Sequence, residues 1–420
     1  MNSKKFCFIF ILLAGCFFDS FTADTSGVLE RKRICRKKPV MGWASWNHYR
    51  IHIHEDIIKA QADFMADSKL KEAGYTYINI DDGYFGGRDE NGCLISHDKR
   101  FPGGMKALAE YIHDKGLYAG IYTDAGINTC ASYWDKDTLG TGVGLFGHEY
   151  EDLYLFLKEW DYDFVKVDWC GGDWLGLDEQ MTYTKIGRII REIKPEAVFN
   201  VCRWKFPGKW VLDAADSWRI SGDIENKFES ILRIIDINAD LWQYASKGHY
   251  NDMDMLQVGR GMSFEEDKTH FTMWCVMHSP LLLGNDLTNM DDKILEMVTN
   301  KEIIALNQSD FVYQARRIDR QGDLEIWAKP LVSTMSGEIA VVLLNRSSEN
   351  SVIDFPLNMG GIDFLQGYTV RDLWEKKDYP VSTDSVLSFP VAPHGVVALK
   401  IKGKSLPYNV FQYKEKPLSR

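Results

Sequence analysis

Between residues 39 and 286, short apolar runs rich in β-branched residues alternate with longer segments of helical periodicity. This alternation is typical of α/β folds with a parallel sheet, because each helix carries the chain back across the sheet to start the next strand. Eight runs of this kind predict a (β/α)8 barrel, the TIM-barrel fold. The expected strands are Val40–Trp46, Tyr75–Asp82, Leu117–Asp124, Phe164–Asp168, Val198–Trp204, Ser217–Asp223, Tyr250–Met255 and Met273–Leu283.

The segments between these strands carry helix signals. Glu55–Ala73 and Met105–Lys115 are each followed by a glycine, Gly74 and Gly116, at the position where helices commonly end. The other expected helices are Tyr150–Glu159 and Met181–Ile193. A doubly wound open sheet is the alternative architecture, but no Gly-rich phosphate loop of the dinucleotide type follows the first strand.

A different pattern begins after about residue 310. Short strands separated by Gly, Asn, Ser and Asp turns, without a long helical pattern, predict an antiparallel β-sandwich. We therefore expect a barrel at residues 36–310 and a β-sandwich domain at 315–403. The expected sandwich strands are Leu324–Ala328, Ile339–Leu344, Ser351–Phe355, Tyr368–Asp372, Ser385–Phe389 and Gly395–Ile401.

Acidic side chains recur where the expected barrel strands end. In a (β/α)8 barrel these ends form one rim, and active sites lie there. A single strand-end Asp commonly caps the next helix, and Asp124 and Asp286 taken singly fit that role. Recurrence at six of the eight strands instead predicts a rim that binds a polyhydroxylated ligand. The residues are Asp81, Asp82, Asp124, Asp168, Asp223, Asp252, Asp254 and Asp286.

Two of these carboxylates form a candidate catalytic pair. Lys166 and Asp168 are two residues apart on one strand and so face the same side, where the ammonium favours an ionised, nucleophilic Asp168. A structural ion pair is the alternative. Asp223 could donate a proton if its surroundings raise its pKa. Carboxyl groups about 5–5.5 Å apart would cleave a glycosidic bond with retention, and groups about 6.5–9.5 Å apart with inversion.

The same rim offers groups that could hold a sugar. Asp81 and Asp82 leave the second strand together, and paired acceptors can bind two hydroxyls. Trp46 could present an apolar face to a pyranose or else lie in the core; the chain has 13 tryptophans, which is rich. The formal net charge of -11 argues against nucleic acid and anionic membranes as partners. A neutral carbohydrate fits better.

The N-terminus has the features of an export signal. Two lysines precede the apolar run Phe6–Ala14, which is too short to span a bilayer. We expect a signal peptide at residues 1–23, cleaved near Thr22-Ala23. The alternative is a bacterial lipobox at Leu13-Ala14-Gly15-Cys16, which would place a lipid anchor on Cys16. Either route predicts a periplasmic, outer-membrane-anchored or secreted protein, in which disulfides can persist.

The cysteines give no sign of a metal site. No CxxC pair or Cys/His cluster is present, so we expect neither a metal nor another cofactor. Outside the N-terminal segment the cysteines are Cys35, Cys93, Cys130, Cys170, Cys202 and Cys275.

Motifs in order along the chain resemble glycoside hydrolase family 27, the α-galactosidases and their relatives. They are MGWASWN (41–47), INIDDGY (78–84), RFPGGM (100–105), IYTDAGINTC (121–130), VKVDWCGG (165–172), SWRISGD (217–223), YNDMDML (250–256) and SPLLLGND (279–286), followed by IWAKPL, VVLLNR, RDLWEKKD and APHGVVALKI. The resemblance covers residues 36 to 402. It implies a (β/α)8 barrel followed by a β-sandwich, and double displacement with retention.

The resemblance also implies roles for individual residues. Asp168 matches the family nucleophile and Asp223 the acid/base. Cys130 and Cys170 match cysteines that form a disulfide beside the site. The positions that match sugar contacts are Trp46, Asp81, Asp82, Tyr122, Lys166, Arg219 and Asp254.

Two motifs depart from the family pattern. The usual Cys-Glu-Trp of the fifth strand is Cys202-Arg203-Trp204, so a guanidinium replaces a carboxylate that helps to read the sugar 2-hydroxyl. We keep Arg203 and Trp204 among the expected substrate contacts, with recognition at C2 open. The usual Asp-Asp-Cys-Trp is Asp81-Asp82-Gly83-Tyr84.

These residues favour an exo-acting retaining enzyme that removes terminal α-D-galactosyl residues. Asp81 and Asp82 suit the axial O4 and free O6 of galactose, while bulky Arg203 and Phe206 argue against a pocket enlarged for an N-acetyl group. A β-L-arabinopyranosidase, an isomalto-dextranase-like enzyme and an α-N-acetylgalactosaminidase are the alternatives within the family. A non-catalytic glycan-binding protein is the alternative from another class, although such proteins usually lose one of the two acids.

Overall fold

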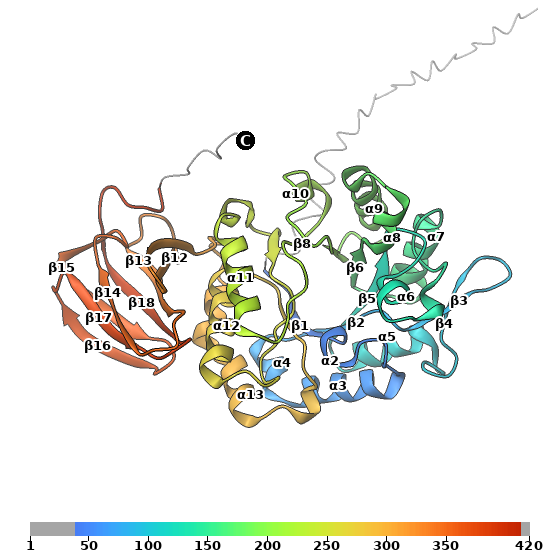
Figure 1. Cartoon of the computed structure of the whole chain (residues 1–420), viewed down its shortest axis with the longest axis horizontal. Coiled ribbons are helices and arrows are strands. Elements are labelled where there is room, and N and C mark those ends of the chain that lie inside the picture. Colours follow the sequence, from blue (N-terminus) through green and yellow to red (C-terminus); the bar gives the residue numbers. More distant parts are fainter. Residues whose placement is uncertain (1–37, 413–420) are drawn as a thin grey trace, which may run out of the picture.

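The computed structural model describes residues 38–412 as a (β/α)8 barrel followed by an antiparallel β-sandwich (Figure 1). The expected signal peptide at residues 1–23 and the lipid-anchor position Cys16 lie outside the described residues. No helix in the described part is both long and apolar enough to cross a membrane.

Eight parallel strands form the barrel wall in the order β10-β1-β2-β5-β6-β7-β8-β9. The wall closes where Leu256, just after β9, forms a parallel bridge with Leu283 of β10. Nearly every strand residue is buried, which is why these strands appear in the sequence as continuous apolar runs. Their bounds are β1 Met41–Ala44, β2 Tyr77–Ile80, β5 Tyr118–Asp124, β6 Phe164–Asp168, β7 Val198–Val201, β8 Ser217–Arg219, β9 Tyr250–Asp252 and β10 Leu281–Leu283.

Most helices pack outside the wall, and other short ones lie in the loops after the strands. The helices of the outer layer are α3 Glu55–Asp67, α4 Lys69–Ala73, α5 Gly104–Asp114, α7 Glu149–Tyr154, α9 Glu179–Ile193, α11 Phe228–Ala239, α12 Phe264–Val276, α13 Asp292–Val298 and α14 Lys301–Asn307. The short loop helices are α2 Trp46–Tyr49, α6 Cys130–Trp134, α8 Cys170–Leu175 and α10 Val211–Ala214, and a small hairpin of β3 Phe85–Arg88 and β4 Leu94–Ser96 follows β2.

Two expectations for the barrel elements were wrong. The expected helix Glu55–Ala73 is divided at Ser68, whose side chain caps α4, although Gly74 ends α4 in the left-handed conformation as expected. The expected strand Met273–Leu283 begins inside helix α12, and only Leu281–Leu283 is a strand. Because α12 is buried on nearly all sides, its sequence lacks the alternation of apolar and polar residues by which helices are recognised.

The β-sandwich pairs a six-stranded sheet, ordered β11-β12-β13-β18-β15-β16, with the two-stranded sheet β14-β17. The strands are β11 Arg316–Gln321, β12 Leu324–Pro330, β13 Glu338–Asn345, β14 Ser351–Pro356, β15 Ile362–Asp372, β16 Lys377–Ser382, β17 Val386–Val391 and β18 Val396–Ser405. The sequence did not predict β11 and β16, which are mostly polar and lie at the sheet edges. Trp327, Val342 and Leu344 belong to the same apolar cluster as the barrel core, so the two domains share a buried interface.

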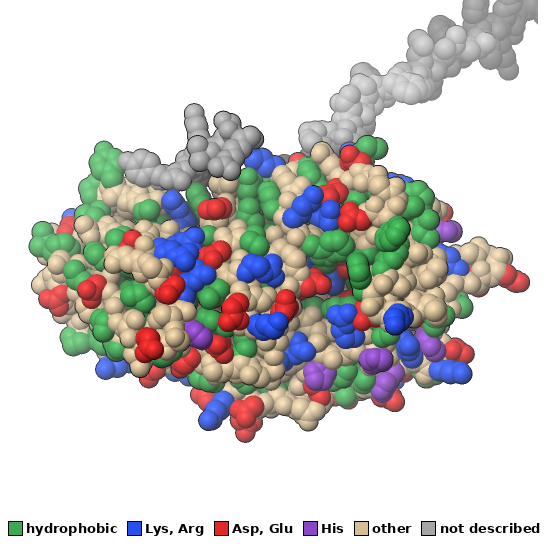
Figure 2. Space-filling view, in the orientation of Figure 1, with side chains coloured by type: hydrophobic (Ala, Val, Ile, Leu, Met, Phe, Trp, Pro, Cys, Tyr) green, Lys and Arg blue, Asp and Glu red, His purple; other side chains and the backbone are tan. Residues whose placement is uncertain are grey.

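The surface carries no single-sign patch on the face shown in Figure 2, where acidic and basic side chains are interspersed.

Candidate active site

A cavity of about 490 Å³ opens where the barrel strands end and gathers ten of the eleven expected catalytic and sugar-binding residues. The expected residues that line it are Trp46, Asp81, Asp82, Tyr122, Lys166, Asp168, Trp204, Arg219, Asp223 and Asp254. Arg203 is the residue that does not line it. Because these side chains come from seven strands or the loops after them, closure of the barrel is what brings them together.

Asp168 is the last residue of β6 and is only 6% exposed. Its Oδ1 accepts a hydrogen bond of 3.0 Å from the backbone N–H of Trp169, which fixes the carboxylate. Burial raises the pKa of Asp168 to about 6, and the positive charge of Lys166 only partly opposes this effect. The carboxyl group is therefore mostly ionised at neutral pH, as a nucleophile must be.

Lys166 lies beside Asp168, but its ion pair is with a different carboxylate. Its Nζ lies 2.8 Å from Asp81 Oδ2, and it also lies 5.2 Å from the centroid of the Tyr122 ring. Lys166 lowers the pKa of Asp168, as expected, but burial has the larger effect and leaves that pKa above its usual value.

Asp223 follows β8 and has a side chain that is 68% exposed. One of its oxygens lies 3.0 Å from Arg219, which also forms a 2.8 Å ion pair with buried Asp254. Partial burial raises the pKa of Asp223, but the positive charges of Arg219 and Lys166 together lower it by more. The pKa of Asp223 therefore lies below its usual range. The condition set for a proton donor, a raised pKa, is not met in the free enzyme.

Asp81 and Asp82 follow β2 and differ in their partners. Asp82 accepts hydrogen bonds from the backbone N–H groups of Gly83 and Ala131, at 2.8 and 2.9 Å, and burial raises its pKa to about 7. Gly83 stands where the family usually has cysteine. Its φ is 108°, and a Cβ on this residue would lie only 2.8 Å from the Cα of Ile51, so the position has room for glycine alone.

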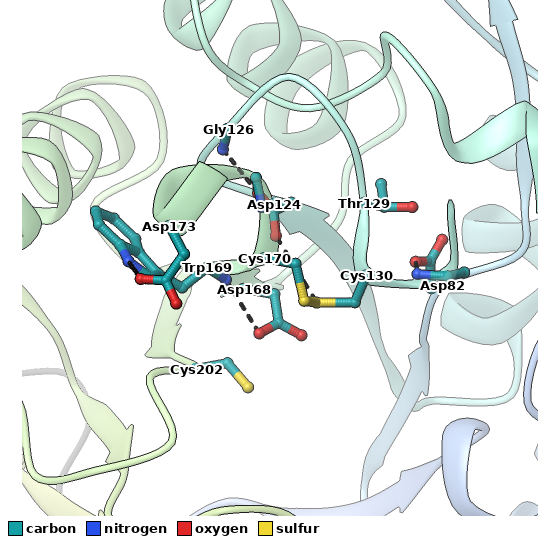
Figure 3. The surroundings of a disulfide bond; sticks show 12 residues. Asp82, Asp124, Gly126, Thr129, Cys130, Asp168, Trp169, Cys170, Asp173 and Cys202 are labelled. Carbon is teal, nitrogen blue, oxygen red and sulfur yellow. Dashed lines mark hydrogen bonds between the residues drawn. A yellow bond between two sulfur atoms is a disulfide. The ribbon is translucent and has the colours of Figure 1, made fainter. Parts of the chain in front are cut away.

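A disulfide between Cys130 and Cys170 lies beside the Asp168 carboxylate (Figure 3). It joins the first residue of α6 to the first residue of α8, two residues after Asp168. Buried Asp124 adds a second link, since its Oδ1 accepts from the N–H groups of Gly126 and Gly171 at 2.7 and 3.0 Å. The segment that follows Asp168 is therefore held from two sides.

The strand-end acids outside the catalytic group have structural partners. Asp286 caps a short 3-10 helix at Leu287–Asn289, as a single strand-end Asp commonly does, whereas Asp124 organises the loop described above. Asp124 and Asp168 also lie near both cysteines in the one cluster of potential metal ligands among the described residues. The two sulfur atoms of that cluster are joined in the disulfide and offer no thiolates. Cys93, Cys202 and Cys275 are free, and Cys35 lies outside the described residues.

Arg203 does not line the cavity, and its expected contact with substrate remains a prediction. Its guanidinium bonds Glu179 at 2.7 Å and Asp173 at 3.3 Å. Phe206 likewise stacks on Tyr244, with ring centroids 4.5 Å apart, and does not line the cavity. The argument from bulk against an N-acetyl pocket therefore has no support in the structure.

Several cavity residues were not predicted from the sequence. Arg50, Trp134 and Asp135 line the cavity from the loops after β1 and β5. The guanidinium of Arg50 lies 4.2 Å from the centroid of the Trp46 ring, so one face of that ring is already covered. Strand-end patterns cannot locate residues of this kind, because they lie in loops. The available signal in the sequence was a tryptophan among polar residues in the SYWDKD run (132–137).

Comparison with known proteins agrees with this geometry. The family model described as "Alpha galactosidase A" matches residues 38–309, and the model of the α-galactosidase C-terminal β-sandwich domain matches residues 321–401. α-Galactosidase A of Cellvibrio japonicus is 40% identical over 388 residues, which cover 87% of this chain and 92% of that protein. α-Galactosidase 2 of Arabidopsis thaliana is 39% identical, with 85% and 87% covered.

Solved structures give the same result. The crystal structure of α-galactosidase I from Mortierella vinacea superposes with a TM-score of 0.79 at 29% identity, covering 88% of this chain and 98% of that one. The chain belongs to the α-galactosidase family, glycoside hydrolase family 27.

Proposed function

We propose that this protein is an exo-acting retaining α-galactosidase that removes terminal α-D-galactosyl residues from oligo- or polysaccharides. The observation that carries the proposal is one cavity that holds both Asp168 and Asp223 among the residues that match the family's sugar contacts. A glycan-binding protein without catalysis would not need both carboxylates in the same cavity.

The burial of the two carboxylates supports different roles for them. Asp168 is 6% exposed, which suits a nucleophile that meets the anomeric carbon where water is excluded. The Asp223 side chain is 68% exposed, which suits a group that must reach first the leaving oxygen and then a water molecule. We therefore assign Asp168 as the nucleophile and Asp223 as the acid/base.

The reaction follows in two steps. First, an Asp168 oxygen bonds to the anomeric carbon as the glycosidic C–O bond breaks, and Asp223 gives its proton to the departing oxygen. Second, Asp223 takes a proton from water, the water oxygen bonds to the anomeric carbon, and Asp168 leaves as a carboxylate. Two inversions at that carbon retain its configuration.

The pKa of Asp223 has to change between these steps. A bound substrate covers its exposed carboxylate, and the loss of water raises the pKa of Asp223 towards that of a proton donor. Formation of the ester then removes the negative charge of Asp168, which lowers the pKa of Asp223 again. The lowered pKa in the free enzyme, which comes from the positive charges of Arg219 and Lys166, suits a base.

The remaining polar groups suit the sugar hydroxyls. The Lys166–Asp81 and Arg219–Asp254 ion pairs are buried at 2.8 Å each and present fixed donors and acceptors to the cavity. Fixed, water-shielded groups orient a sugar with little loss of freedom on binding.

A panel of aryl glycosides tests the proposal: α-galactoside, β-L-arabinopyranoside, α-N-acetylgalactosaminide and α-glucoside. The expected result is the highest kcat/KM for the α-galactoside, with NMR showing α-galactose as the first product. An Asp168→Asn variant is the control and should be inactive. Preference for another glycoside would move the protein to one of the alternatives, and an active Asp168→Asn variant would end the proposal.

We also propose that residues 1–23 direct export, with cleavage near residue 23 or, by the lipoprotein route, before Cys16. Mass spectrometry of the mature N-terminus distinguishes the two routes, and an intact N-terminus on the native protein would contradict both.

A further inference from the structure

Trp134, at the end of α6, stands on the wall of the catalytic cavity with 74% of its surface exposed. Indole is the largest apolar side chain, and leaving it in water forgoes the stabilisation that burial would bring. Trp174 is similarly exposed, at 75%, but it stacks on Tyr133 with ring centroids 5.7 Å apart and does not line the cavity. Of the two, only Trp134 offers its surface to the contents of the cavity.

Arg50 and Asp135, the residue that follows Trp134, line the same cavity. Arg50 forms a two-pronged ion pair with Asp135, with its NH2 group 2.7 and 2.9 Å from the two carboxylate oxygens. The same guanidinium lies 4.2 Å from the centroid of the Trp46 ring. Trp46, Arg50, Asp135 and Trp134 therefore give the cavity lining both apolar and polar groups, and this composition suits a pyranose, which has C–H faces and hydroxyl edges.

Trp134 lies on a helix that is held rigidly relative to the catalytic residues. Helix α6 begins at Cys130, whose disulfide partner Cys170 follows Asp168 by two residues. The N–H of Ala131, the second residue of α6, donates to Asp82 Oδ2 at 2.9 Å. A surface positioned in advance loses little freedom when a ligand binds to it.

We propose that Trp134 is the stacking platform for the sugar that precedes the terminal galactose in the chain, and that the Arg50–Asp135 pair binds the hydroxyls of that sugar. The ligand is a neutral pyranose on the leaving-group side of the scissile bond. This inference rests on the proposed function, because it takes the terminal galactosyl unit to lie at Asp168. The cavity of about 490 Å³ extends from Asp168 to Trp134 and so can hold more than the galactosyl ring.

The test compares two substrates that differ on the leaving-group side. Raffinose carries a pyranose there, whereas α-D-galactosyl fluoride carries a single atom. In Trp134→Ala, the ratio of kcat/KM for raffinose to kcat/KM for the fluoride should fall about tenfold, the size expected for a lost aromatic contact. In Trp134→Phe, which keeps a ring, the ratio should fall less.

Trp174→Ala is the matched control, since it removes an equally exposed indole from the neighbouring helix outside the cavity. Its ratio should equal that of the wild type. An unchanged ratio in Trp134→Ala, or an equal fall in Trp174→Ala, would overturn the inference. A wild-type enzyme that hydrolyses neither substrate would instead contradict the proposed function itself.

Discussion

Replacing the buried Asp168 by Asn should stabilise the fold while it abolishes turnover. Burial raises the pKa of this carboxyl group from 3.8 to about 6. At about 1.36 kcal/mol per pKa unit, the ionised group costs the folded state about 3 kcal/mol. Asn is neutral and nearly the same size, and its Oδ1 can keep the hydrogen bond from Trp169 N–H. It cannot form the glycosyl ester.

The sign of the pH dependence follows from the same shift. Below about pH 4 the carboxyl group is protonated in both folded and unfolded chains and costs nothing, so the variant should gain no stability. The gain should grow as the pH rises towards 6 and reach about 3 kcal/mol above it. Urea denaturation of both proteins at pH 4, 5, 6 and 8 measures this difference in the free energy of unfolding.

Asp286→Asn is a control in which the free energy of unfolding should change in the opposite direction. Although partial burial raises the pKa of Asp286, hydrogen bonds from Gln61, Thr288 and other neighbours lower it to about 2. Its ionised form therefore stabilises the folded state at neutral pH, and this stabilisation is lost as the pH falls from about 4 through 2. If Asp168→Asn gains no more stability at pH 8 than at pH 4, the electrostatic reasoning about the nucleophile is wrong.

Three further predictions concern the catalytic roles, the disulfide and the second domain. Azide should restore turnover in Asp223→Ala and give α-galactosyl azide, whereas in Asp168→Ala it should give the β-anomer; the opposite anomers by NMR would reverse the assigned roles. Replacing Cys130 and Cys170 by Ala should lower the free energy of unfolding, measured in urea, by about 4 kcal/mol, the chain-entropy estimate for a bridge across 40 residues; a loss below about 1 kcal/mol would contradict that estimate. Deleting residues 315–420 should expose the barrel face that packs on Trp327 and reduce thermal stability; a soluble barrel with unimpaired melting temperature would show that the β-sandwich does not stabilise it.

The fold could be predicted because parallel strands buried on both faces leave a clear apolar signature. β6 begins and ends at the predicted residues Phe164 and Asp168. The predicted strand Met273–Leu283 was wrong at its start because a helix can carry the same apolar signature. Helix α12 is buried on nearly all sides, so the segment at Met273 is as apolar as a strand. It also missed β11 and β16, since edge strands with polar residues resemble loops in sequence.

The active-site residues at the strand ends could be predicted for a related reason. Residues at the ends of parallel strands must meet at one rim, so Asp81 and Asp168 could be placed together without coordinates. The partner of each side chain could not be predicted, and Lys166 pairs with Asp81 although Asp168 is nearer in sequence. The wall formed by Arg50 and Trp134 comes from loops, whose course depends on tertiary contacts that no periodicity records.

The position of the Arg203 side chain could not be predicted from the motif that contains it. Cys202 and Trp204 both line the cavity, whereas Arg203 between them does not, and its guanidinium lies beside the Trp204 ring, 5.3 Å from the ring centroid. There the guanidinium is held by Glu179 at the start of α9 and by Asp173 in α8. The change from carboxylate to guanidinium at this position therefore places no cation on the cavity lining. Recognition at C2 must then come from groups that do line the cavity, and the α-N-acetylgalactosaminide in the substrate panel is the compound that measures how strict it is.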